Sequence, residues 1–538
     1  MSRRGKNLVQ HITEIFEKDD LDIPITIFKV PKSLTQANPE VYVPKLMGLG
    51  AMHHLRPRLK HMQMYKVMEA KKIHKGFQGI AFSELIEILK EIVVSSVRAS
   101  YNIYLEIEDD ILTCIMAVDG LFLFDLLCCY GIEKQHLLSS NILSQMVDST
   151  GRRLAQETTL REAMMLENQI PILVLRTILI IESPEFEIVS EYLPKILVGF
   201  CQYVSPFDIM IDYPPYKTLN HAHLLDLLYH LIIPEDNFQE ENDLNDLLRG
   251  LFDNVKSKIQ ALKAPKQETR KRIRRTKIMT FEAALDVSLN LAPIQYKKTI
   301  ELAKGLFSLP WSELGSSVSS AVKGAIVEEE TLIPTASELH KAGVKFVPGA
   351  QIRSIKFDSK SVSLHLPSMK LGGNSDVIIK NLVAYEALIK SETEELVLAP
   401  YAEIMSDLIR TSDDVMVLKN DGIIKLDQSI DERQVIKVFS RMNKSVQSTN
   451  TSESIDKQIE TVKSYYNGLW KVSARRFINK GWLVAGNWCK VLAAVLLLVL
   501  MGIQAFCSVY ECHRLSFKTN NSSQSLQGLR VLSLRSDV

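Results

Sequence analysis

The sequence predicts a mainly α protein: a helical body with a small β-hairpin element and one C-terminal transmembrane helix. Three observations support this prediction. Apolar residues recur at helical spacing in most segments of the chain. One short stretch alternates apolar and polar residues, as strands do. Near the C-terminus, Val491 to Val509 form nineteen residues without a charge, close to the length of about 20 residues that spans a bilayer.

Composition excludes several classes of protein. Of 538 residues, 46% are hydrophobic and 24% are charged, which is enough apolar material for a packed core and excludes a disordered polymer. The 64 basic and 63 acidic residues nearly balance, so we expect no nucleic-acid partner. Seven cysteines without repeated spacing do not form a disulfide framework.

Residues 1–22 are predicted to form a short amphipathic segment, because apolar residues alternate there with charges. They lack the apolar stretch of a signal peptide, so no cleavable secretory signal is expected. Residues 23–234 then form the first part of the helical body. Phe82, Leu85, Leu89 and Val93 share one helical face.

The first part of the body continues with three apolar segments. Ile111 to Tyr130 is expected to be largely buried and to be interrupted at Asp119-Gly120. Met164 to Ser183 is a core helix, because its apolar run is short and is broken by Arg176. His221 to Ile233 is helical with a wide apolar face.

Residues 235–333 are predicted to be a variable, partly disordered insertion, because composition shifts after Pro234. Within it, Lys263 to Lys277 holds eight basic residues against one acidic residue. The run is interpreted as a solvated linker, as a contact with anionic lipid, or as a nuclear import or RNA contact. The last interpretation lacks the interleaved aromatic residues that stack on bases.

Residues 334–480 are predicted to form the second part of the body. Thr335 and Glu338 fit a capping box, and Gly343 follows the end of that short helix. Alternating residues predict a β-hairpin from Ile352 to Phe357 and from Val362 to Leu366. Further helices are expected at Val377–Ile389, Tyr401–Arg410, Glu432–Met442 (with a capping box of Ser429 and Glu432) and Ile455–Phe477.

Residues 491–509 are the predicted transmembrane helix, and residues 510–538 are a short polar tail. More basic residues precede the span than follow it, which favours a cytosolic body and an exoplasmic tail. The basic residues before it are Lys471, Arg475, Arg476, Lys480 and Lys490, and those after it are Arg514 and Lys518. The sequence does not specify which membrane is crossed.

Modification sites depend on this topology. Asn520 and Asn521 match the N-glycosylation pattern and lie in the exoplasmic tail, whereas the inverted topology would expose Asn443 and Asn450 instead. Cys489, at the cytosolic end of the span, is a candidate palmitoylation site.

No catalytic, cofactor or metal site is predicted. The best metal candidates are His53, His54, His61 and His74. Adjacent histidines rarely point at one ion and no cysteine lies at a useful spacing, so packing or capping is favoured.

Three polar sites in apolar surroundings have structural interpretations. Asn168 and Gln169 are expected to cap the helix that starts near Pro171. Asp226 is expected to be solvated or paired, and Asp119 to lie in a bend or turn. Glycine-rich phosphate loops and GxSxG, HExxH or paired CxxC motifs do not occur in the sequence.

Seven short sequence motifs, which follow one another in the order found in the family, resemble a plant family of unknown function. This is domain-of-unknown-function family 247, also called uncharacterised protein family 0481. The motifs are IFKVPKSL (27–34), VYVPKLMGLGAMHH (41–54), LENQIP (166–171), HLLDLL (223–228), ASELHKAGVKF (336–346), IKNLVAYE (379–386) and DGII (421–424). The resemblance implies a mostly helical body held at a membrane by a C-terminal helix. The resemblance points to no particular enzymatic activity, because none is established for the family.

The leading functional hypothesis is a non-enzymatic, membrane-anchored interaction or signalling protein with an unknown protein partner. One alternative is an enzyme with an unrecognised active site in the helical core. The other is a soluble regulator whose apolar tail packs in a complex.

Overall fold

The structure is a computed structural model. The chain divides into two units, Met1–Tyr466 and Asn467–Val538. The residues described are 24–54, 56–77, 80–131, 157–182, 186–210, 212–234, 241–263, 333–390, 394–427, 430–440, 453–469, 496–497 and 499–501. In these ranges the chain is mainly helical with small sheets, as predicted.

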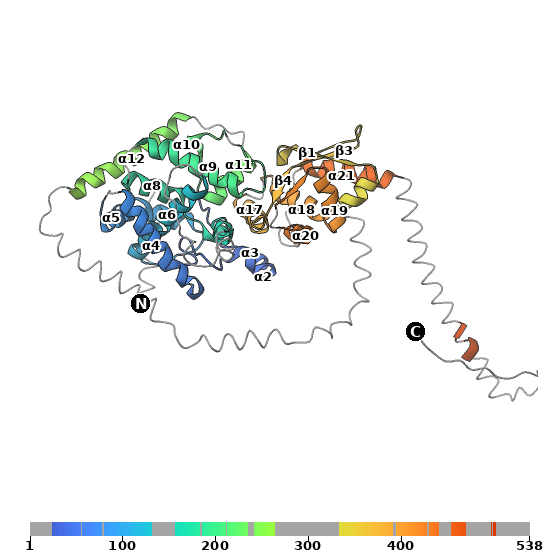
Figure 1. Cartoon of the computed structure of the whole chain (residues 1–538), viewed down its shortest axis with the longest axis horizontal. Helices are drawn as coiled ribbons and strands as arrows, with labels where there is room; N and C mark the ends of the chain where they lie inside the picture. Colours follow the sequence, from blue (N-terminus) through green and yellow to red (C-terminus); the bar gives the residue numbers. More distant parts are fainter. Residues whose placement is uncertain are drawn as a thin grey trace, which may run out of the picture. The chain divides into compact units, whose positions relative to one another are not determined.

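The elements of the N-terminal part of the body are helices joined by loops in its described residues. It is built around α6 (Asp109–Gly131), which packs against α4, α5, α8 and α9 (Figure 1). The other elements of this part are α2 (Lys32–Ala37), α3 (Pro39–Tyr42), η1 (Pro57–Leu59), α4 (Lys60–Phe77), α5 (Phe82–Ser100), η3 (Leu166–Asn168), α8 (Ile172–Glu182), η4 (Ile188–Tyr192), α9 (Leu193–Val204), α10 (Pro215–Thr218), α11 (Leu224–Ile232) and α12 (Glu241–Lys263).

Helix α6 is one continuous helix, so the predicted interruption at Asp119-Gly120 is wrong. In the described part of the chain it is the one helix long and apolar enough to cross a membrane, but most of its residues are buried inside the body. Gly120 allows α6 and α8 to pack closely, because an added Cβ would lie only 2.6 Å from Ile178 Cδ1 of α8. Glycine is used here for close packing, not for a turn.

The backbones of α6 and α9 meet at two glycines. A Cβ at Gly199 would lie 2.0 Å from the carbonyl oxygen of Gly131, and a Cβ at Gly131 would lie 2.3 Å from that of Ile196. Both obstacles are backbone atoms, which cannot rotate away as a side chain can.

Gly199→Ala is therefore expected to lower the free energy of unfolding by about 1–3 kcal/mol, the usual cost of overpacking. The measurement is denaturant unfolding of the full-length protein in detergent. Gly250→Ala on α12 is the matched control, because nothing lies within 4 Å of the added Cβ and the helix gains roughly 0.5–1 kcal/mol. Equal stabilities of the two variants would contradict the close contact.

The C-terminal part of the body combines helices with two small sheets. Its helical elements are α16 (Ala336–Lys341), η5 (Ile352–Ser354), α17 (Ser375–Ile389), α18 (Leu398–Leu408), α19 (Ser412–Asn420), α20 (Glu432–Phe439) and α21 (Glu453–Gly468). Its strands are β1 (Lys345–Gly349), β2 (Lys356–Asp358), β3 (Ser363–Pro367), β4 (Met369–Leu371) and β5 (Ile424–Leu426).

The predicted hairpin is present as β2 and β3, which pair antiparallel with Phe357 opposite Leu364. It is shorter than expected, because Ile352–Ser354 form the 3₁₀ helix η5. Strand β1 adds to β3 in parallel, and β4 pairs in parallel with β5 from a distant part of the chain. Short parallel pairings depend on tertiary contacts, so the local pattern did not reveal them.

The capping box of Thr335 and Glu338 is confirmed at the start of α16. The second predicted capping box is wrong in register. Helix α20 is capped by Asp431 together with Gln434, whereas Ser429 lies outside the described residues. Asp is as good an N-cap as Ser, so the sequence offered two competing starts.

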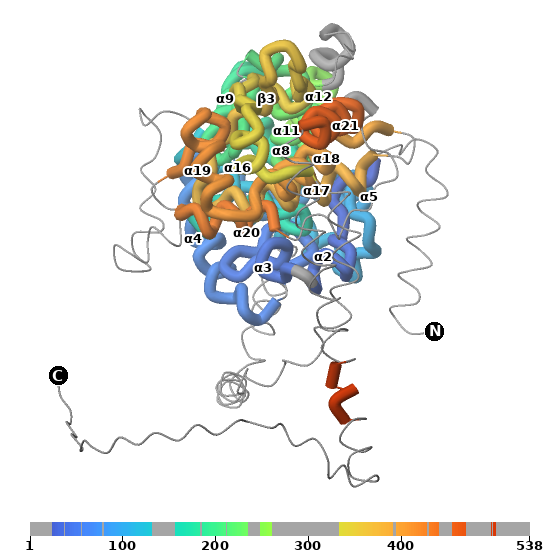
Figure 2. The backbone as a smooth tube through the Cα atoms, turned by 90° about the vertical axis from the view of Figure 1, so that its right-hand side faces the viewer, coloured from blue at the N-terminus to red at the C-terminus, as the bar shows by residue number. Residues whose placement is uncertain are grey.

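The two parts of the body share one apolar core, which extends from Ile27 to Val462. Helix α17 contacts α3, α11 and η3 of the N-terminal part. Lys370 N–H donates to the Pro206 carbonyl at 2.8 Å, and Phe207 bridges Met369. In Figure 2, strand β3 and helices α16 to α20 of the second part face the viewer.

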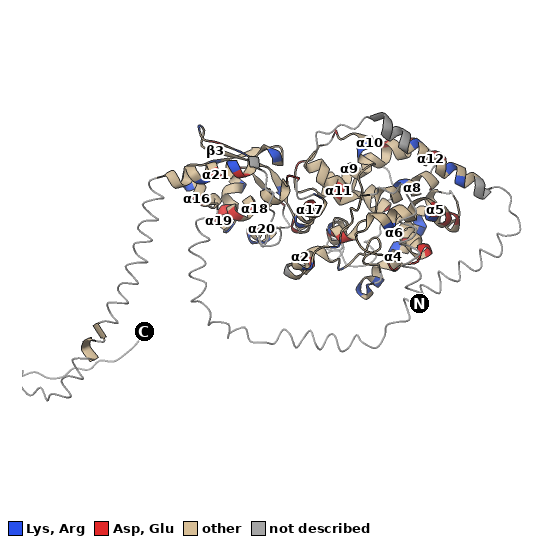
Figure 3. Cartoon of the chain, turned by 180° about the vertical axis from the view of Figure 1, so that it is seen from behind, with Lys and Arg blue, Asp and Glu red and all other residues tan. Residues whose placement is uncertain are grey.

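Part of the predicted insertion belongs to this body. Helix α12 contacts α5, α8 and α10, and Lys and Arg residues recur along its ribbon (Figure 3). Of the basic run Lys263–Lys277, the structure describes only Lys263. The predicted modification sites lie outside the described residues, namely Asn443, Asn450, Cys489, Asn520 and Asn521.

Candidate functional site: polar clusters around α17 and α11

Buried carboxylates hold the segment between α3 and η1, and the backbone just before α2, in place. Glu162 accepts hydrogen bonds from three successive backbone N–H groups, those of Lys45, Leu46 and Met47, at 2.6–3.1 Å. Glu167 accepts from Val30 N–H at 2.9 Å. Charge-assisted bonds to backbone donors are strong in a buried setting, so these carboxylates fix a loop.

Asn168 and Gln169 brace other segments instead of capping the helix after Pro171, so that prediction is wrong. Asn168 accepts from Leu49 N–H at 2.6 Å and donates to the Met47 carbonyl at 3.0 Å. Gln169 donates to two carbonyls of its own segment and accepts from Leu225 N–H, at the start of α11, at 3.2 Å. The two side chains connect η3 to the loop on one side and to α11 on the other.

Asp119 forms a buried ion pair with Lys66, and the prediction of a bend at this position is wrong. Lys66 is 1% exposed and Asp119 is fully buried. Lys66 also donates to the Gly48 carbonyl, and Asp119 accepts from Gly50 N–H at 3.0 Å. The pair joins α4 and α6 to the same loop that Glu162 holds.

The four histidines proposed as metal candidates do not converge on one another in the described ranges. His53 is buried with Nε2 3.1 Å from Glu167 Oε2, and burial lowers its pKa. His54 Nδ1 lies 3.0 Å from the Ala51 carbonyl, and His74 Nδ1 lies 2.5 Å from Glu182 Oε1. His61 is exposed.

Asp125 on α6 is a buried carboxyl of a different kind. It is 2% exposed, and its Oδ2 has no hydrogen-bond partner among the described residues. Burial, with a smaller effect of Glu69, raises its pKa from 3.8 to about 6. Folding therefore takes up a proton at Asp125 between about pH 4 and pH 6.

The pKa of Asp125 is higher in the folded chain than in the unfolded chain, so its effect on stability depends on pH in a defined direction. Stability is lost as the pH rises from about 4 to about 6, and the loss is complete above the folded-state pKa. Asp125→Asn is expected to stabilise the protein by about 2 kcal/mol at pH 8 and to have little effect at pH 4. Unfolding curves at both pH values test this, with exposed Asp253→Asn as control. A stability difference between Asp125→Asn and wild type that is the same at both pH values would contradict the assignment.

Helix α17 carries polar side chains that connect the two parts of the body. Asn381 accepts from Leu166 N–H and donates to the Val41 carbonyl, both at 2.9 Å. Glu386 is fully buried and accepts from the Tyr229 hydroxyl at 2.9 Å. It also accepts from the first amides of α18, those of Val397, Leu398 and Ala399, at 2.7–3.0 Å.

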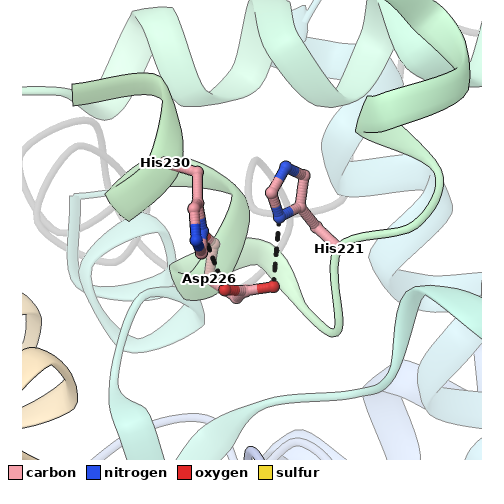
Figure 4. Close-up of side chains that lie close together, drawn as sticks. All are labelled: His221, Asp226 and His230. Atoms are coloured by element: carbon pink, nitrogen blue, oxygen red, sulfur yellow. Dashed lines mark hydrogen bonds and ion pairs between the residues drawn. The ribbon is translucent and has the colours of Figure 1, made fainter. Parts of the chain in front are cut away.

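Asp226 lies in a cluster with two histidines at the N-terminal end of α11 (Figure 4). His221 Nδ1 lies 3.2 Å from Asp226 Oδ2, and His230 Nδ1 lies 3.0 Å from Asp226 Oδ1. The Tyr385 hydroxyl of α17 donates to Oδ1 at 2.7 Å. The Tyr213 hydroxyl lies 2.8 Å from His221 Nε2.

Local capping explains why Asp226 is buried there. His223 is the N-cap of α11 and accepts from Asp226 N–H, while Asp226 Oδ2 accepts from Ala222 N–H at 2.7 Å. Burial alone raises the pKa of Asp226, but the hydrogen bonds from His221 and His230 outweigh burial and hold the pKa well below 3.8. The sequence predicted that Asp226 would be either solvated or paired, and the structure shows that it is paired.

Sequence reasoning missed the cluster as a unit. Asp226 and His230 lie four residues apart on one helix face, which is a readable signal. His221 precedes the helix and lies beside Asp226 because the chain bends at residues 221–223, just before α11. Three side chains of types that can bind a metal ion come together here. Within the described residues, the potential ligand atoms of His221, Asp226 and His230 all lie within 4.8 Å of one another.

The fold and these clusters define a mainly helical protein whose two sequence parts are joined by buried polar side chains. The chain belongs to the family described as plant protein of unknown function, DUF247, whose model matches residues 27–500. It is similar to a putative UPF0481 protein of Arabidopsis thaliana, with 31% identity over 93% of each chain. A second UPF0481 protein of Arabidopsis is 23% identical over 90% of this chain and 86% of its own. The comparison with solved structures found no significant match.

Proposed function

We propose that this protein is a non-enzymatic interaction or signalling protein held at a membrane by Val491–Val509, with its body on the cytosolic side. One observation carries the proposal. The described residues of that segment, 496–497 and 499–501, are helical, and their apolar side chains are 53–65% exposed. They are Leu496, Leu497, Val499, Leu500 and Met501.

A helix with such a surface needs an apolar environment. Each Leu or Val left in water forgoes about 1.5–3 kcal/mol of burial free energy. Helix α6 is also long and apolar enough to cross a membrane, but α4, α5, α8 and α9 already cover it. For the C-terminal segment, a bilayer is the environment that matches nineteen uncharged residues.

The hydrogen bonds and the ion pair of the buried acidic residues are structural contacts, which supports a non-enzymatic role. Glu162, Glu167 and Glu386 accept backbone N–H groups, and Asp119 is paired with Lys66. These contacts hold loops and helix ends in fixed positions. Rigid helical surfaces on such a body are suited to binding a partner.

The proposed orientation assigns the remaining sites. Asn520 and Asn521 would be the glycan acceptors, and Cys489 would be available for palmitoylation on the cytosolic side. The basic run Lys263–Lys277 would contact anionic lipid of the cytosolic leaflet, where each Lys or Arg near the surface contributes about 1 kcal/mol.

Alkaline extraction of membranes tests the anchor. Full-length protein is expected to stay in the membrane pellet, whereas Leu496→Arg/Leu500→Arg is expected to be released, because each central charge costs about 2.5–3.5 kcal/mol. Met64→Arg/Met68→Arg is the matched control, since both methionines are exposed on α4, and it should remain in the pellet. Release of the wild type would favour the soluble regulator with a tail packed in a complex.

A second candidate function is an enzyme, and the observation that favours it is the cluster of His221, Asp226 and His230, whose two imidazoles are 12% and 20% exposed. Proximity labelling separates the two functions. A binding protein should label a defined set of neighbours above a control that consists of residues 481–538 alone. Identical labelling by both would contradict the interaction role of the body.

A further inference from the structure

We propose that His221, Asp226 and His230 form a Zn²⁺ site with three protein ligands and one position open to a further donor. The inference does not depend on the membrane anchor. It rests on the convergence of two imidazoles and one carboxylate, on the groups that hold them, and on their access to solvent.

The donor set and its spacing suit zinc. Histidine nitrogens and a carboxylate oxygen bind Zn²⁺ at about 2.0–2.2 Å, which places neighbouring ligand atoms roughly 3.3 Å apart at the tetrahedral angle. Here each Nδ1 lies 3.0 or 3.2 Å from an oxygen of Asp226, and all three ligand atoms lie within 4.8 Å. Small side-chain rotations therefore bring the three ligands to coordination distance.

Capping alone does not require the two histidines. Asp226 already receives Ala222 N–H on Oδ2 and the Tyr385 hydroxyl on Oδ1, which satisfies its structural role. A carboxylate has about four lone-pair positions, so two remain, and both face an imidazole nitrogen. The rings of His221 and His230 also lie 4.7 Å apart, which places both imidazoles at one site.

Outer groups hold the ligands as they do in known metal sites. A metal-bound histidine usually gives its other ring N–H to a fixed acceptor. The Tyr213 hydroxyl lies in that place for His221, 2.8 Å from Nε2. Tyr385 of α17 orients Asp226 from the other side, so an ion here would also stabilise the contact between α11 and α17. His230 Nδ1 also lies 3.0 Å from the Asp226 carbonyl, a contact that ion binding would replace.

The test uses full-length protein in detergent, stripped of metal with a chelator and titrated with Zn²⁺ by calorimetry. Co²⁺ serves as the spectroscopic probe, because its visible absorption reports tetrahedral coordination. Wild type is expected to bind one ion per chain. His221→Gln and His230→Gln should each weaken binding by at least about tenfold, and Tyr213→Phe by about tenfold.

Exposed His61→Gln is the matched control and should bind as the wild type does. Zn²⁺ should raise the melting temperature of wild type but not of His221→Gln/His230→Gln. Tyr213→Phe keeps all three ligands, so it tests the site even if a ligand variant folds poorly. The proposal is overturned if the folded wild type binds no Zn²⁺, or if the double variant binds it with unchanged affinity.

Discussion

Replacing Lys66 by methionine is expected to lower the free energy of unfolding by about 3–5 kcal/mol, the usual cost of removing one partner from a buried ion pair. Methionine fills a similar volume, so the loss reflects charge and not a cavity. Asp119, which is fully buried, would keep its carboxylate without a cation, and the Gly48 carbonyl would lose its donor. Chemical denaturation of the full-length protein measures the effect.

Lys90→Met is the matched control, because Lys90 pairs with Asp110 at 2.8 Å while both side chains are largely exposed. Such surface pairs contribute about 0–1 kcal/mol. The double variant Lys66→Met/Asp119→Leu should recover part of the loss, since it removes the isolated charge. Equal losses in Lys66→Met and Lys90→Met would contradict the buried pair.

Replacing Glu386 by glutamine is expected to lower the free energy of unfolding by about 2–4 kcal/mol, because several hydrogen bonds to one charged acceptor are disturbed together. The new amide nitrogen is a donor and would face one of the donors that now bind the carboxylate. These donors belong to Tyr229 on α11 and to the start of α18. The variant therefore weakens the contact between the two parts of the body.

Hydrogen exchange measured by mass spectrometry should show faster exchange at the amides of Leu398 and Ala399 in Glu386→Gln, together with the lower stability. Glu394→Gln is the control, since Glu394 is half exposed and pairs with nearby Lys390 at 3.3 Å. Unchanged exchange at the start of α18 would show that Glu386 does not hold this helix end.

Helices were predictable where their periodicity was strong. The amphipathic pattern from Phe82 predicted α5, and the capping box of Thr335 and Glu338 marked the start of α16. Buried helix α6 was harder, because Asp119 and Gly120 look like a break when only the local sequence is considered. The partner of Asp119 lies 53 residues away on α4, so only the tertiary structure explains it.

Strands were predictable only where pairing was local. The hairpin of β2 and β3 follows from neighbouring residues, whereas β4 and β5 pair across more than fifty residues of chain. Each of these two strands is three residues long, which is too short for a pattern to emerge. Their pairing depends on the packing that joins the two parts of the body.

The sequence motifs that resemble the family are joined to one another by hydrogen bonds in the fold. Asn168 of LENQIP binds the backbone at Met47 and Leu49, within VYVPKLMGLGAMHH. Tyr385 of IKNLVAYE donates to Asp226 of HLLDLL. Each motif taken alone looks like an isolated set of polar residues, because the hydrogen-bond partner of its polar side chain lies in another motif.

The candidate metal cluster illustrates the same limit. The histidines near residue 53 attracted attention because they are adjacent, yet His53 and His54 have separate partners, Glu167 and Ala51. His221 and His230 are nine residues apart and looked unrelated. The bend at residues 221–223 and one helical turn of α11 bring them to one carboxylate.

Protease protection on sealed microsomes, with epitope tags at both ends, tests the central claim of a membrane-anchored cytosolic body most directly. The account predicts that the N-terminal tag is digested, that the C-terminal tag survives, and that any glycosidase-sensitive shift depends on Asn520 and Asn521. Digestion of both tags would contradict the span. Protection of the N-terminal tag, with glycans at Asn443 and Asn450, would contradict the orientation and place the body on the exoplasmic side.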